Sequence, residues 1–103
     1  MNVTVTQEDV AAGVREDCRN CAVALALRRA DNSMCWYVEA AGYIYRGLNR
    51  DERWFVVPTE TRRKVDAFID AFDDDPFTAW QSLEGPLAFQ IEQDFEYAEA
   101  QRQ

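Results

Sequence analysis

A Cys-X-X-Cys pair, Cys18 and Cys21, has a spacing that can support chemistry. Such a pair can bind a thiophilic metal or exchange its thiols with a disulfide. A metal would need further ligands, and the chain contains no histidine to supply one. Redox pairs usually follow a strand of a thioredoxin-like fold, and that context is missing here. We therefore interpret both cysteines as small core side chains on one face of a helix.

Three consecutive acids, Asp73, Asp74 and Asp75, are a second candidate. A calcium loop needs spaced acids, a glycine and a closing glutamate, whereas here Pro76 follows at once. The chain also has no glycine-rich phosphate loop, no nucleophile elbow and no HExxH helix. We predict a protein that is not an enzyme and has no catalytic residue, no bound metal and no cofactor.

Charge is distributed unevenly along the 103 residues. Residues 66–103 contain ten acids and one base, a net charge of −9, whereas residues 1–65 carry a net charge of +1. A field of this kind repels nucleic acid and attracts basic protein surfaces. The acidic third is therefore the strongest functional indication in the sequence.

The N-terminal third contains signals for one strand and two helices. Val3-Thr4-Val5 alternates as a strand does, and Thr6 can cap a helix that ends near Gly13. Asp17 is the expected N-cap of a second helix over residues 18–30, which is rich in alanine and leucine.

The rest of the chain is predicted to form strands over 34–38, 43–48 and 54–57, a helix over 61–75, a short helix over 77–83 and a strand over 87–93. The first three strands follow one another closely, which favours an antiparallel meander. Thr59 or Thr61 is the expected cap of the long helix. Its bases lie at its N-terminal end and its acids at its C-terminal end, so both oppose the helix dipole. A residue choice that costs stability is a place to look for function.

We therefore predict one α+β domain over residues 1–103, with a small antiparallel sheet of about four to five strands packed against two main helices. The sequence has no signal-peptide pattern and no apolar segment long enough for a bilayer. We expect a cytoplasmic protein with no membrane partner.

Six aromatic residues fall on the strands of the predicted meander: Trp36, Tyr37, Tyr43, Tyr45, Trp54 and Phe55. We expect most of them to be core and leave room for one exposed patch. Outside the meander, Trp80 lies among acids and is the ring that we expect to be exposed. Exposed tryptophan and tyrosine rings are typical anchors of protein interfaces.

Three parts of the chain carry a resemblance to a known family: Val3-Thr4-Val5-Thr6-Gln7-Glu8-Asp9-Val10 with Gly13; Cys18-Arg19-Asn20-Cys21-Ala22-Val23-Ala24-Leu25-Ala26-Leu27; and Val57-Pro58 with Ala67-Phe68-Ile69, Phe72-Asp73 and Pro86-Leu87-Ala88-Phe89-Gln90-Ile91. They resemble small uncharacterised proteins of actinobacterial phages and prophages. That family more often has proline where Ala22 stands, and its counterpart of the segment 74–84 is usually shorter. The resemblance implies a compact α+β domain of phage origin and names no functional residue.

Charge and resemblance together predict a small acidic phage-type protein. It is expected to bind a basic surface of a host protein and to inhibit that protein by charge mimicry. The target class is a nucleic-acid-handling or defence enzyme, with no direct nucleic-acid binding by this chain. The predicted partner-binding residues are Asp66, Asp70, Asp73, Asp74, Asp75, Phe77, Trp80 and Glu84. Two alternatives stay open: a small-molecule- or metal-binding module at Cys18 and Cys21, and a structural homodimer joined through a strand edge.

Overall fold

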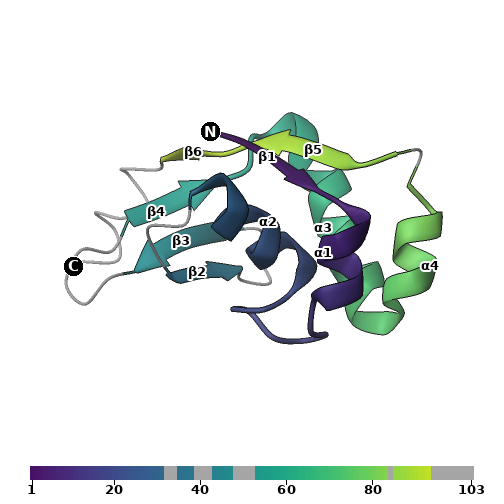
Figure 1. Cartoon of the computed structure of the whole chain (residues 1–103). Helices are drawn as coiled ribbons and strands as arrows, with labels where there is room; N and C mark the ends of the chain where they lie inside the picture. The colour runs from purple at the N-terminus through teal and green to yellow at the C-terminus, as the bar shows by residue number, and fades with distance from the viewer. Residues whose placement is uncertain (32–34, 39–42, 48–52, 84, 94–103) are drawn as a thin grey trace.

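The computed structural model describes residues 1–31, 35–38, 43–47, 53–83 and 85–93. Within these ranges the elements, in chain order, are β1 (Asn2–Val5), α1 (Gln7–Ala12), α2 (Ala22–Ala30), β2 (Cys35–Val38), β3 (Tyr43–Gly47), β4 (Arg53–Val56), α3 (Thr59–Asp74), α4 (Pro76–Gln81), β5 (Leu87–Gln90) and β6 (Glu92–Gln93) (Figure 1). Every helix among these residues is too short or too polar to traverse a bilayer.

The strands form two antiparallel sheets, which corrects the prediction of a single sheet. β1 pairs with β5, and a four-stranded sheet has the order β2-β3-β4-β6. The α+β class and the β2-β3-β4 meander are correct. The single sheet of four to five strands is wrong, and so is the count of two main helices, because the described residues form four helices.

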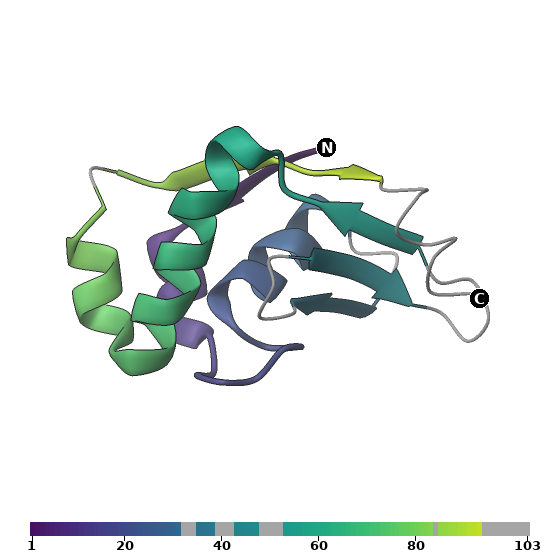
Figure 2. The same cartoon turned by 180° about the vertical axis from the view of Figure 1, so that it is seen from behind.

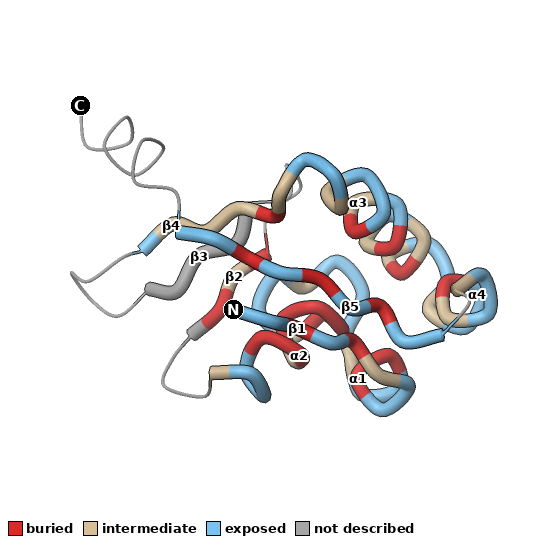
Figure 3. Tube along the Cα trace, turned by 90° about the horizontal axis from the view of Figure 1, so that it is seen from above, coloured by how far each residue is buried: buried red, intermediate tan, exposed pale blue. Residues whose placement is uncertain are grey.

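The predicted strand over 87–93 is divided between the two sheets. Its alternation is correct, since Leu87, Phe89 and Ile91 are buried while the intervening residues are exposed (Figure 3). Ile91 exchanges two hydrogen bonds of 3.0 Å with Met1, and beyond it β6 pairs with β4. Alternation reports which face of a strand is buried but not which strand lies beside it, so the change of partner was not predictable.

The first helix follows the predicted signals, but the second starts later than predicted. Thr6 caps α1 in a reciprocal capping box with Asp9, and Gly13 is its C-cap. Asp17 does not cap α2: its carboxylate accepts from the backbone N–H groups of Arg19 and Asn20 and closes a turn. The helix begins only after that turn, with Cys21 as its N-cap.

The long helix α3 has Pro58 at its N-cap position and no side-chain cap, so the predicted caps Thr59 and Thr61 are wrong. The Thr61 hydroxyl donates to the Pro58 carbonyl at 3.3 Å instead. Proline suits this start because its φ is already close to the helical value.

The core lies between the two sheets and the helices. α2 packs against β1 and β2, and α3 packs against β5 and α4. Figure 1 shows β1 and β5 along the top of the molecule with α1 and α2 below them, and α3 is in front in the reverse view of Figure 2. The largest fully buried side chains include Trp36 from β2, Leu27 from α2 and Phe72 from α3. One end of the molecule is left to α1, α4 and the end of α3 (Figure 1).

A candidate protein-binding groove between α1 and α4

The end of α3 and the start of α4 form an acidic corner, which we define as Asp70, Asp73, Asp74 and Asp75. Asp70, Asp74 and Asp75 are exposed, and Asp73 is half-buried. The fifth predicted acid of this region, Asp66, lies in the middle of α3, half-buried and with one carboxylate oxygen buried. No lysine or arginine occurs in the sequence between Val65 and Gln93, and Arg15, from the loop after α1, is a single base that lies against the end of α3. The local field is therefore negative, as the sequence predicted.

Two acids of this corner have structural roles. The Oδ1 atom of Asp73 accepts from the N–H of Glu16 at 2.9 Å, and its carbonyl accepts from Arg15 Nε at 2.7 Å. Asp75 is the N-cap of α4 and accepts from Phe77 N and from the Thr78 hydroxyl. The Thr78 hydrogen bond is the main reason that the pKa of Asp75 lies below its usual range.

These contacts change the interpretation of the charges that oppose the dipole of α3. Asp75 sits at the N-terminus of α4, where a negative charge is favourable. Asp73 ties the loop after α1 to the end of α3. The predicted cost to stability is therefore offset for two of the acids, and Asp70 and Asp74 are the exposed acids of the corner for which no such contact is observed among the described residues.

An apolar groove lies next to the acidic corner. It has a volume of about 610 Å³ and is lined by Gln7, Val10, Ala11, Gly13, Val14, Arg15, Pro76, Phe77 and Trp80. Phe77 is 67% exposed and Val14 is 51% exposed, so two of the three exposed large apolar side chains of the described residues meet here. A clustered apolar surface of this kind marks interaction sites more often than scattered exposed residues do.

The two predicted apolar anchors, Phe77 and Trp80, differ in exposure. Phe77 is exposed, whereas Trp80, which we expected to be the exposed ring, is half-buried and packs partly against the core. Both line the groove. Glu84 lies outside the described residues. Val14 was not among the residues predicted to bind a partner. The signal that could have identified it is its position directly after Gly13, which ends the helix, because an apolar residue there lies outside any apolar helical stripe.

The two cysteines do not share the predicted core face. Cys18 is exposed and precedes α2, whereas Cys21 is buried and its Sγ accepts from Ala24 N at 3.5 Å. Burial is the largest effect on the Cys21 thiol and raises its pKa, against the hydrogen bonds from the α2 backbone. Both thiols border a cavity of about 270 Å³ that Asp70 and Asp73 also line. Within the described ranges, no three acidic or cysteine side chains are arranged to hold a metal.

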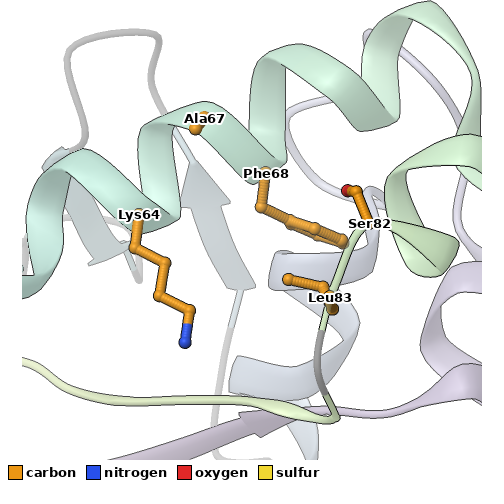
Figure 4. A pocket seen from close by; sticks show the side chains of 5 residues that line it. All are labelled: Lys64, Ala67, Phe68, Ser82 and Leu83. Atoms are coloured by element: carbon orange, nitrogen blue, oxygen red, sulfur yellow. The ribbon is translucent and has the colours of Figure 1, made fainter.

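Another hollow, of about 340 Å³, lies between α3 and the segment after α4 (Figure 4). Phe68, Ser82 and Leu83 gather on one side of it, and Lys64 extends along the other. The Ser82 hydroxyl already donates to the Ala79 carbonyl at 2.9 Å. Lys64 is the one charged residue of the lining, so the hollow lacks the converging polar groups that orient a small ligand.

Of the four meander rings that the structure describes, Trp36 is buried in the core, Phe55 is half-buried and packs against it, and Tyr37 and Trp54 are half-buried. Trp36 is 2% exposed, donates from Nε1 to the Asp31 carbonyl, and lies 5.4 Å from the Phe55 ring. Tyr37 is half-buried under the Arg19 guanidinium, 4.8 Å from its ring centre, and Trp54 is also half-buried. The side chains of Tyr43 and Tyr45 lie outside the described part. Among the described residues, two of the three exposed large apolar side chains line the groove.

Searches of protein-family models, of curated proteins and of solved structures find nothing that matches this chain. The resemblance to the actinobacterial phage family accordingly stays a prediction.

Proposed function

We propose that this protein is a small acidic binding protein that attaches to a basic surface of another protein. The observation that carries the proposal is that Asp75, at the end of the acidic corner, accepts from the N–H of Phe77, whose side chain is 67% exposed. An apolar anchor next to complementary charge combines affinity with fast, oriented association.

The contacts of the corner favour a mixed apolar and acidic docking surface over a row of charges that imitates phosphates. The Asp73 and Asp75 carboxylates accept hydrogen bonds from the chain itself, so part of their capacity is used. Asp70 and Asp74 are then the acids best placed to meet lysine or arginine side chains of a partner. A basic surface covered in this way loses its access to nucleic acid, which is how binding would inhibit a nucleic-acid-handling host enzyme.

The experiment captures partners from lysate of a candidate host on immobilised protein and elutes them along a salt gradient. The test variant is Asp70→Asn/Asp74→Asn. The matched control, Glu60→Gln/Glu92→Gln, removes the same charge from exposed positions elsewhere on α3 and on β6. We expect the test variant alone to weaken binding by about tenfold, mainly through slower association and with a flatter salt dependence. Equal weakening by both variants would refute the proposed surface, because only overall charge would then matter.

A further inference from the structure

The groove between α1 and α4 has a mainly apolar lining, which the charges of the acidic corner do not account for. Its walls come from α1, from the loop at Gly13 to Arg15, and from α4. Arg15 is the one charged residue among the lining, and its Nε donates to the Asp73 carbonyl. The groove therefore presents mainly apolar side chains to its occupant.

We propose that this groove receives the apolar face of a basic amphipathic helix of the partner protein. The inference rests on the proposed function and specifies the part of the partner that is bound. The groove volume of about 610 Å³ is comparable to that of small-molecule pockets, roughly 300–1,000 Å³, which leaves room for apolar side chains of a partner.

The apolar character of the occupant follows from the exposed side chains. Phe77 lies on α4 and Val14 in the loop after α1, and both are more than half exposed. Trp80, which is half-buried, also lines the groove. Covering these groups removes apolar area from water, which is the main driving force of association.

The helical form of the occupant follows from the groove walls. α1 and α4 are helices, so these two walls offer no strand edge to which a partner strand could add. Recognition along them uses side chains. A helix presents apolar side chains on one face and charged ones on its flanks, which suits a groove with an acidic border.

The basic character of the occupant follows from the charges along the groove. Asp74 and Asp75 directly precede the lining residue Pro76, and the Asp75 carboxylate accepts from the N–H of the lining residue Phe77. Both acids are exposed. Against them stands Arg15, whose side chain is held at the end of α3. Lysine or arginine residues on the flanks of a bound helix would meet this border, which makes the charge complementary.

The test uses two synthetic peptides of leucine and lysine with identical composition. One places its leucines on a single helical face, and the other distributes them evenly. Titration of isotope-labelled protein, followed by amide and indole NMR signals, reports both the affinity and the place of binding. We expect the amphipathic peptide to shift the Gly13 and Val14 amides and the Trp80 indole, and to bind about tenfold more tightly than its isomer.

The variants Phe77→Ser and Val14→Ser should each weaken the amphipathic peptide by about tenfold. Both side chains are exposed, so the fold should be retained, and Ala88→Ser on the exposed face of β5 is the control. Equal binding of the two peptides, binding of neither, or shifts outside the groove would overturn this inference. The proposed function would fail separately, if the Asp70→Asn/Asp74→Asn protein captured its partner as tightly as the unmodified chain.

Discussion

The ion pair between Asp9 and Arg29 yields the sharpest stability prediction. Asp9 is 5% exposed, and its carboxylate accepts from Arg29 Nη1 at 2.6 Å, from Arg29 Nη2 at 2.8 Å and from the Thr6 N–H at 2.8 Å. Arg29 also donates to the Thr4 carbonyl. This network joins β1, α1 and α2, so its loss should affect the whole domain.

The perturbation is Asp9→Asn. The amide keeps one acceptor oxygen, so one of the two hydrogen bonds from Arg29 is lost and the other keeps only the charge of the guanidinium donor. Loss of a hydrogen bond to a charged group costs about 1.5–3 kcal/mol. Because the Arg29 side chain is 50% exposed, water replaces part of the interaction, and we expect a net loss of about 2 kcal/mol. For a domain of this size the midpoint of thermal unfolding should fall by roughly 8–16 °C.

The assay is denaturant unfolding followed by circular dichroism, with Glu8→Gln as the control. Glu8 is exposed in the same turn of α1, so its substitution should cost less than about 0.5 kcal/mol. A loss below about 0.5 kcal/mol for Asp9→Asn as well would refute the reasoning, since the buried carboxylate would then contribute no more than a surface charge.

The pH dependence of the unfolding free energy, compared between the unmodified chain and Asp9→Asn, checks the sign of the contribution that the Asp9 carboxylate makes to stability. Burial, the largest single effect, raises the pKa of Asp9, but the hydrogen bonds from Arg29 and Thr6 together outweigh it and lower the pKa. A lowered folded-state pKa stabilises the protein above the unfolded value of about 3.9, and this stabilisation is lost as the pH falls through the folded value. The stability gap between the unmodified chain and Asp9→Asn should therefore stay constant from neutral pH to about pH 5 and narrow below about pH 4. A gap that widens on acidification would contradict the assignment.

Two further predictions test the burial pattern. Phe72→Ala should cost about 3–5 kcal/mol of unfolding free energy because Phe72 is 1% exposed, whereas Phe77→Ala should cost less than about 0.5 kcal/mol; denaturant unfolding compares them, and similar losses would contradict the exposed position of Phe77. Brief labelling of the native protein with a thiol reagent, mapped by mass spectrometry, should modify Cys18 and leave Cys21 intact until unfolding, because Cys21 is buried with a raised pKa; equal labelling would contradict this.

Asp9→Asn and Phe77→Ser affect different properties of the protein, its stability and its groove. Asp9 lies in α1, one wall of the groove, but its carboxylate points to Thr6 and Arg29. Asp9→Asn should therefore lower stability without removing a groove side chain. Phe77→Ser should remove a groove side chain and leave the stability nearly unchanged. Measuring peptide binding and unfolding on the same two proteins separates a loss of the fold from a loss of the binding surface.

Local features of the chain were determined by the sequence itself. The capping box at Thr6, the alternation of Leu87, Phe89 and Ile91, and the buried stripe of α3 at Val65, Phe68 and Phe72 each arise from neighbouring residues. Capping depends on side-chain chemistry within one helical turn, and burial periodicity depends on residues within a few positions. The acidic character of the last third is likewise a property of composition.

Only the tertiary structure decided which elements meet. The segment 87–93 contributes to two sheets because β5 pairs with β1, some 90 residues away along the chain, and β6 pairs with β4. Asp73 and Asp75 became a loop tie and a helix cap because Glu16 and α4 lie beside them. The groove exists because Val14 and Phe77, far apart in the chain, are brought to the same end of the molecule. Such contacts depend on the arrangement of whole elements, and local residue patterns record which faces are apolar but not which partners cover them.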